Sequence, residues 1–209
     1  MKMNRKIALL NLLLAFGISV FGQVTLRPYV GLNSPTMTKE LLDESEFESN
    51  FGFQAGIDVQ FGEKVYVQPG LQIEALSNTK VFLPDAAPGL SSFDIKRTYL
   101  RIPLMVGYHF GNDESFFDIR LFTGPNAAFK VGGSVSSADG VIKDLNIDEE
   151  LSNLILGWNG GVGIDFLSIF FVDIGYQIGL SDVFKETEGL NSGVRNNVFY
   201  ANGGLKFRL

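Results

Sequence analysis

Few residues in this sequence have types and spacings that suit catalysis. The 209 residues include one histidine, His109, and no cysteine. Hydrolysis and acyl transfer usually need a base beside a hydroxyl nucleophile, and no serine stands at a suggestive spacing from His109. The sequence also shows no phosphate-binding loop, no paired metal-ligand motif and no hydrolase elbow. We therefore predict a protein that is not an enzyme, with no catalytic residue, no cofactor and no metal site.

The chemistry that the sequence does offer is the pairing of opposite charges. Acidic, basic and amide side chains stand at alternate positions of otherwise apolar segments, so in β-strands they would share one face. Opposite charges on the inner face of a narrow tube would satisfy each other. The alternating set holds six basic and five acidic residues: Arg27, Arg101, Arg120, Lys130, Lys206 and Arg208, with Asp58, Glu74, Asp118, Asp165 and Asp173. Nine of them are predicted to form a structural polar network in a lumen: Arg27, Asp58, Glu74, Arg101, Asp118, Arg120, Asp165, Asp173 and Lys206.

These residues need strands to position them, and the sequence supplies eight. The segment FGFQAGIDVQF, residues 51–61, alternates without a slip between apolar residues and polar or small ones. This period of two predicts a β-strand. The eight predicted strands are Val24–Asn33, Phe51–Phe61, Val65–Ser77, Lys96–Phe110, Phe116–Lys130, Leu154–Phe166, Ile169–Ser181 and Asn197–Leu209.

The connections between the predicted strands alternate in length. Three are short, at Gly62–Lys64, Gly111–Ser115 and Leu167–Ser168. The four long ones are Ser34–Asn50, Asn78–Ile95, Val131–Asn153 and Asp182–Asn196. Tight turns at one rim and longer outward loops at the other are typical of barrels in the outer membrane. The fold class that we predict is all-β: an eight-stranded antiparallel up-and-down transmembrane β-barrel.

Alternation alone does not say which face of the sheet meets lipid. The apolar set contains no charge, and the chain has 19 phenylalanines. An eight-stranded barrel has an interior only just wide enough for side chains, so the smaller polar residues fit there better than the bulky apolar ones. We predict that the polar face points inward and that Phe53 contacts lipid. The alternative is a soluble secreted barrel that carries an apolar ligand, as lipocalins do, with the two faces exchanged.

The N-terminus predicts export. Three basic residues precede an apolar run from Ile7 to Phe21, and small residues follow at the end of the run. This pattern predicts a signal peptide at residues 1–22 and a mature barrel domain at 23–209. Its removal leaves 14 basic against 23 acidic residues and moves the formal charge from −6 to −9. Such a charge disfavours nucleic acid as a partner, and the predicted location is the bacterial outer membrane.

The last eight residues, NGGLKFRL, suggest how the barrel is assembled. Asn202, Gly204, Phe207 and Leu209 have the spacing polar-x-Gly-x-x-apolar-x-apolar. This spacing resembles the terminal signal by which the barrel assembly machinery recognises its substrates. Leu209 stands where an aromatic residue is usual, and any final strand that ends on the lipid face would give part of the pattern.

Four segments together resemble a known family. They are YLRIPLMVGYHF (99–110), FTGPNAAF (122–129), WNGGVGIDF (158–166) and DIGYQIGLSDVF (173–184). The set is similar to the recurrent strands of PorT-like outer-membrane β-barrel proteins of Bacteroidota, which are small barrels of the OmpA/OmpX type. The resemblance implies the fold and the location, and since the named member of the family is linked to type IX secretion, it also raises an accessory role in secretion.

The long loops are the remaining place for function. The run DESEFE, residues 43–48, could hold a divalent cation that bridges to lipopolysaccharide, although a solvated acidic loop explains it as well. We interpret the protein as a non-enzymatic outer-membrane barrel with a plugged polar lumen, acidic outward loops, and a structural or binding role. Its expected partners are outer-membrane lipid, lipopolysaccharide and the barrel assembly machinery, with secretion-system proteins in the alternative interpretation.

Overall fold

A computed structural model describes residues 23–39, 47–48, 51–81, 93–111, 116–137, 152–182 and 194–209. The predicted signal peptide and much of each long loop lie outside these ranges. Within them, no helix is long and apolar enough to cross a membrane.

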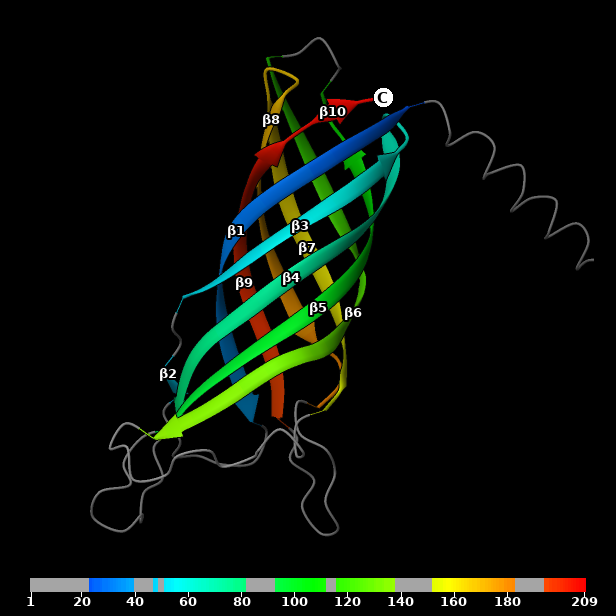
Figure 1. Ribbon diagram of the computed structural model, residues 1–209. Coiled ribbons are helices and arrows are strands. Elements are labelled where there is room, and N and C mark those ends of the chain that lie inside the picture. The colour runs from blue at the N-terminus through cyan, green and yellow to red at the C-terminus, as the bar shows by residue number, and fades with distance from the viewer. Residues whose placement is uncertain are drawn as a thin grey trace, which may run out of the picture.

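The described chain forms a closed antiparallel barrel of eight long strands, with two short strands beside them (Figure 1). The predicted fold class is confirmed. The long strands are β1 (Val24–Lys39), β3 (Gly52–Phe61), β4 (Val65–Val81), β5 (Phe93–His109), β6 (Phe117–Ser137), β7 (Leu154–Phe166), β8 (Phe170–Gly179) and β9 (Val194–Leu205). The short ones are β2 (Phe47–Glu48), which pairs with β4, and β10 (Phe207–Arg208), which pairs with β1.

The first and last strands close the barrel. β1 pairs with β9 from Tyr29↔Gly204 to Lys39↔Val194, and each other long strand pairs with its neighbour along the chain. At the C-terminus the Leu209 N–H donates to the carbonyl of Val24 at 2.9 Å. Closure therefore leaves no open edge between the first and last strands, as a hydrocarbon environment requires.

The two ends of the barrel differ. Residue 23, the C-terminus and the connections β3–β4 and β7–β8 lie at one end, which we name the turn end (Figure 1). There Leu167 and Ser168 both have positive φ, of 50° and 58°, at the centre of the turn between β7 and β8, in which the Ile169 N–H donates to the Phe166 carbonyl at 3.1 Å. Two such residues form a type I′ turn, which matches the twist of the flanking strands. The opposite end, where the long connections start, is named the loop end.

Several strands run further toward the loop end than the alternation predicts. β7 has its predicted bounds, but β1, β4 and β6 end at Lys39, Val81 and Ser137, and β5 begins at Phe93. Main-chain pairing continues there after the clean alternation of side chains has ended. A register shift between Thr98 and Tyr99, where β5 meets β6, is one cause of that irregularity.

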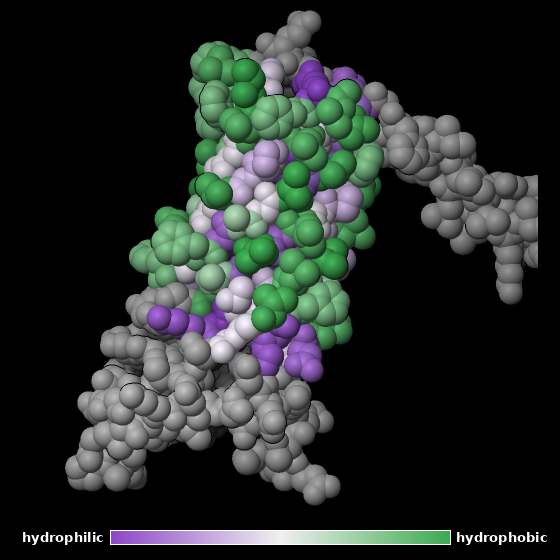
Figure 2. Space-filling model, in the orientation of Figure 1, coloured by the Kyte–Doolittle hydropathy of each residue, from purple (hydrophilic) through white to green (hydrophobic). Residues whose placement is uncertain are grey.

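The apolar face of the wall points outward and the polar face inward. Phe53 is 67% exposed, whereas the next residue, Gln54, is 4% exposed. Figure 2 shows hydrophobic residues spread over the visible wall, with hydrophilic ones gathered mainly near its ends. This is the orientation that the alternation predicts. Two charges depart from it: Lys130 is only half-buried, since it lies at the irregular β5–β6 register, and Arg208 is exposed at the rim.

Inside the barrel, large aromatic rings lie over glycines of the neighbouring strand. Each such ring and glycine are direct cross-strand partners in the register. The pairs are Tyr29 with Gly56, Tyr66 with Gly107, Phe122 with Gly161, Phe171 with Gly204, and Tyr200 with Gly175. A glycine leaves the space that a Cβ would fill, so a narrow lumen accommodates a ring at each pair.

We expect Gly107→Ala to destabilise the barrel by about 1–3 kcal/mol, the usual penalty for overpacking. Its new Cβ would overlap the Tyr66 ring and lie 2.7 Å from the Leu121 carbonyl oxygen. Gly203→Ala is the matched control, because a Cβ at this outward position meets nothing within 4 Å. The measurement is urea-induced unfolding in lipid vesicles, and equal losses for the two variants would contradict the ring–glycine arrangement.

The lipid face can be tested with arginine at two depths. Ile57 lies near the middle of β3 and is exposed, and Val65 is exposed at the turn-end start of β4. Ile57→Arg should lower the free energy of unfolding by about 2–4 kcal/mol, and Val65→Arg by about 0–1 kcal/mol, since the penalty falls toward the interface. Refolding titrations into vesicles measure both, and a larger loss at Val65 would refute the assignment of depth.

Candidate functional site

The lumen holds the candidate site, because the predicted polar residues converge there. All nine residues of the predicted network face inward, and none is more than 9% exposed. They are Arg27, Asp58, Glu74, Arg101, Asp118, Arg120, Asp165, Asp173 and Lys206. They do not form a single cluster, since the hydrogen bonds divide them between the turn end and the middle of the lumen.

Asp165 on β7 is the centre of the turn-end group. Its Oδ1 accepts from Arg27 Nη2 at 3.2 Å and from Arg120 Nε at 3.1 Å. Its Oδ2 accepts from Lys206 Nζ and, at 3.4 Å, from Arg27 Nη1. Three basic side chains from different parts of the wall thus share one buried carboxylate, and Lys206 joins the segment between β9 and β10 to the group.

The group continues around the wall. Arg120 also donates to Asp173 and to the Tyr66 hydroxyl. On the other side, Arg27 Nη1 lies 3.5 Å from Gln60 Oε1, and the Gln60 amide nitrogen lies 2.9 Å from His109 Nε2. His109 Nδ1 pairs with Asp118, whose other oxygen accepts the Gly111 N–H. We name this set the turn-end network: Arg27, Gln60, Tyr66, His109, Asp118, Arg120, Asp165, Asp173 and Lys206. It draws on β1 and β3–β8 and on the residue between β9 and β10, so it spans the whole circumference.

Smaller groups fill the middle of the lumen. Arg101 donates to Glu74 and to Asn126, and Asn126 donates to Asn159 at 2.9 Å. The other contacts join Gln54 with Asn202 and Asn33, Tyr29 with Gln72, and Gln68 with Asp58. These bonds satisfy polar groups that would be unfavourable to bury alone.

Sequence reasoning missed the large residues that share the inward face. Toward the loop end, an apolar layer of Leu76, Tyr99, Ala128, Ile155 and Val198 packs across the lumen. Arg97, which is 2% exposed and stands two residues before Tyr99 on β5, was also missed. The available signal was position: each of these residues has the same parity in its strand as the polar ones.

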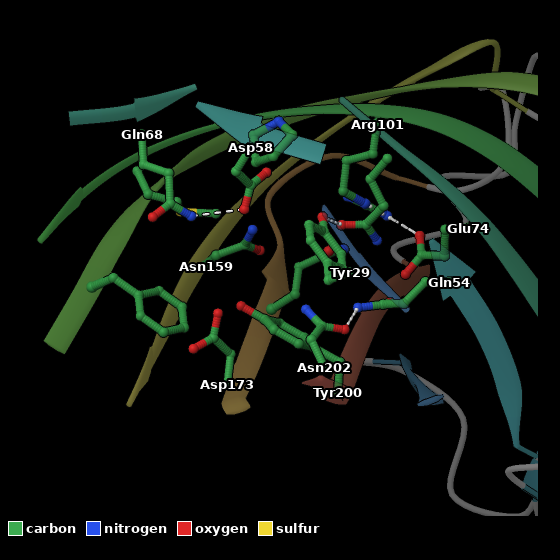
Figure 3. Close-up of a pocket in the computed structure, with 15 residues that line it drawn as sticks. Tyr29, Gln54, Asp58, Gln68, Glu74, Arg101, Asn159, Asp173, Tyr200 and Asn202 are labelled. Carbon is green, nitrogen blue, oxygen red and sulfur yellow. Dashed lines mark hydrogen bonds and ion pairs between the residues drawn. The ribbon is translucent and has the colours of Figure 1, made fainter. Parts of the chain in front are cut away.

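A cavity with a volume of about 30 Å³ lies in the middle of the lumen (Figure 3). Its lining includes Tyr29, Asp58, Gln68, Asp173 and Tyr200. A buried water needs a cavity volume of about 10–15 Å³, so this cavity has room for roughly two waters. Nothing as large as a sugar or an amino acid fits it.

His109, Asp118 and Asp165 bring ligand atoms within 4.8 Å of one another, the spacing of a metal site. Asp165, however, already accepts bonds from Arg27, Arg120 and Lys206. These three positive charges repel a further cation, so the group is better described as part of the turn-end network.

The residues of the proposed assembly signal divide between the two faces. Asn202 is buried and accepts a hydrogen bond from Gln54 at 2.6 Å, and Gly204 lies beneath the Phe171 ring. Phe207 and Leu209 are exposed on the outer wall at the turn end. The signal thus alternates between lumen and lipid face, as a terminal strand does.

A closed wall with an apolar exterior and a charged, filled interior defines an integral β-barrel of the outer membrane. The family described as "Outer membrane protein beta-barrel domain" matches residues 10–185, and the chain belongs to this family. Its location is accordingly the outer membrane. No curated protein sequence matches the chain.

Solved structures support the same fold. OprG from Pseudomonas aeruginosa aligns with a TM-score of 0.53 at 12% identity, covering 90% of this chain and 96% of its own. Ail, the attachment invasion locus protein of Yersinia pestis, aligns with a TM-score of 0.51 at 12% identity, covering 88% of this chain and 98% of its own. At this identity the similarity shows the fold alone.

Asp165→Asn should destabilise the barrel by about 3–5 kcal/mol, because it leaves three buried cations without their shared carboxylate. Lys206→Met is the control, since Asp165 would keep both guanidinium partners, and its loss should be clearly smaller. Unfolding titrations in vesicles compare the two. Equal losses would mean that the carboxylate is not the centre of the turn-end network.

Proposed function

We propose that the protein is a non-enzymatic outer-membrane barrel with a plugged lumen, and that its loops carry a structural or binding role. The observation that supports this most directly is the turn-end network, which crosses the lumen with bonds from all parts of the wall. On the loop-end side of this network, the central cavity has room for roughly two waters. A barrel filled in this way offers a rigid scaffold rather than a path for solutes.

The histidine supports a non-enzymatic role. Both ring nitrogens of His109 have partners within the network, Asp118 on one side and Gln60 on the other. A general base must reach a proton of the substrate, and this imidazole is buried among structural groups. In our proposal His109 has a structural role, hydrogen-bonded to Asp118 and Gln60, and no residue of the lumen acts on a substrate.

We propose that residues 1–22 direct export and that the turn end faces the periplasm. The loop end then faces outward, as in other outer-membrane barrels. The first long connection carries five acidic residues against Lys39, and the third carries five against Lys143. Such loops suit contact with lipopolysaccharide through divalent cations, while the lipid-facing wall and the C-terminal pattern suit bilayer lipid and the assembly machinery.

Conductance tests the plugged lumen. Purified protein in planar bilayers should give no current steps above those of a protein-free bilayer, and loaded vesicles should retain small sugars. A general porin in the same vesicles is the positive control. Regular current steps from the wild-type protein would refute the proposal, because they require a continuous aqueous path.

An accessory role in protein secretion is the second candidate, favoured by the segments at 99–110, 122–129, 158–166 and 173–184 that resemble PorT-like barrels. Deletion of the gene, with complementation, followed by a comparison of secreted proteins tests it. Lost export that returns on complementation supports this role, and unchanged export removes it.

A further inference from the structure

The outer face of the wall contains an apolar hollow with a volume of about 670 Å³, which we name the wall hollow. It extends over the neighbouring strands β9, β1, β3 and β4, and the last three of these lie at the front of Figure 1. The outward-pointing side chains of its lining are all apolar, while the polar side chain of Gln54 points into the lumen. Four small residues form its floor: Ala55, Ala75, Ala201 and Gly203.

The strand register explains why the wall is low at this place. Gly203 and Ala55 lie on either side of Val30 as its cross-strand partners, and Ala75 is the partner of Phe53. A Cβ on Gly203 would meet nothing within 4 Å. Val30 and Phe53 are each 67% exposed. Small residues thus alternate with strongly exposed large ones, and the space between them is a property of this sequence.

Hydrocarbon is the material that meets the wall hollow, because the hollow continues the outer surface of a barrel that lies in the outer membrane. A space left empty beside apolar side chains would forfeit dispersion contacts. Apolar character alone gives no preference for one lipid over another, since lipid tails are as apolar as leucine. A preference must therefore come from the shape of the hollow and from the head group of the lipid.

A basic residue lies beside the wall hollow on its loop-end side. Lys96 is exposed on the outer face of β5. Two residues further along β5, Thr98 is the cross-strand partner of Ala75. Lys96 is therefore one strand, about 5 Å, and two residues, about 7 Å, from the floor of the hollow. A lysine stem covers apolar surface while its ammonium group reaches the polar head groups, so Lys96 suits an anionic lipid.

We propose that the wall hollow binds one acyl chain of lipopolysaccharide and that Lys96 pairs with a phosphate of its head group. The inference rests on the proposed function in one respect, the outward orientation of the loop end, because lipopolysaccharide occupies the outer leaflet. It is separate from the contact proposed for the acidic loops, since a chain in the hollow and a phosphate on Lys96 need no divalent cation.

Lipid A, the phosphorylated glycolipid that anchors lipopolysaccharide, is the probe. Native mass spectrometry of the full barrel in detergent counts bound lipids, and EDTA in the buffer excludes cation-bridged binding at the loops. The wild-type protein should bind one lipid A and should prefer it to phosphatidylethanolamine. The proposal would be overturned by a wild-type barrel that binds no lipid A, that binds both lipids equally, or that forms dimers in place of the lipid complex.

Filling the wall hollow tests its position. Gly203→Leu should weaken lipid A binding by about tenfold or more, because the leucine overpacks the floor. Gly160→Leu is the matched control on the outer face of β7, where the nearest atom to a new Cβ is Thr123 Oγ1 at 3.9 Å. Ala55→Leu fills the same hollow from β3 if Gly203→Leu does not fold. Equal affinities of a folded filling variant and the control would overturn the proposal.

The head-group contact and the orientation have their own tests. Lys96→Gln should weaken lipid A binding about fivefold, whereas Lys64→Gln, exposed at the turn end, should not. Equal effects would refute the contact with Lys96. Asp182→Cys places a single cysteine at the loop end, and an impermeant maleimide should label it on intact cells. An unlabelled cysteine would refute the proposed orientation and with it the choice of lipopolysaccharide, whereas a labelled one with no lipid A binding would refute this inference alone.

Discussion

The structure depends on one constraint: a chain in hydrocarbon must satisfy its backbone hydrogen bonds by itself. Eight long antiparallel strands meet this constraint only by closing, and the closure is made by β1 with β9 and β10. Closure with eight strands also fixes the width of the lumen, which is only just enough for side chains. The glycines opposite aromatic rings follow from that width. A ring such as Tyr66 has space because its cross-strand partner, Gly107, has no side chain.

The same narrowness brings buried charges into contact. A buried ion pair adds little net stability, since the loss of hydration offsets the attraction between the charges. The network has a second physical consequence, which is register. A slip of one residue exchanges the two faces of a strand. Such a slip in β1 or β7 would place Arg27 or Asp165 in lipid, where a charge is strongly unfavourable. The buried charges therefore discriminate against wrong pairings even where they contribute little to the stability of the right one.

This also explains how much could be predicted from the sequence. The alternation at residues 51–61 and the alternating lengths of the connections predict the strands, the closure and the residues that point inward. Both patterns arise because one face of the wall meets lipid and the other faces the polar lumen. Hydropathy alone places the lumen rings Phe122 and Phe171 outside, whereas their parity with Arg120 and Asp173 places them inside. What the sequence could not show is the glycine beneath each ring, because only the register reveals it. The partners of the charges were equally inaccessible. Arg27 lies opposite Asp58 in the sheet but binds Asp165, 138 residues away, by reaching across the lumen.

Arg27 pairs across the lumen with Asp165, although Asp58 is its neighbour in the sheet. Asp165 binds Arg27, Arg120 and Lys206 together, and this convergence leaves Asp58 bonded to Gln68 instead of to its cross-strand partner Arg27. The wall is apolar outside, and the described polar side chains in the middle of the lumen and at the turn end mostly have hydrogen-bond partners, whereas Arg97, Tyr99 and Asn196 toward the loop end keep buried polar atoms without one. Under the proposed function, contact with a partner outside the bilayer is therefore confined to the rims, and the barrel is the support that holds the loop end at the membrane surface.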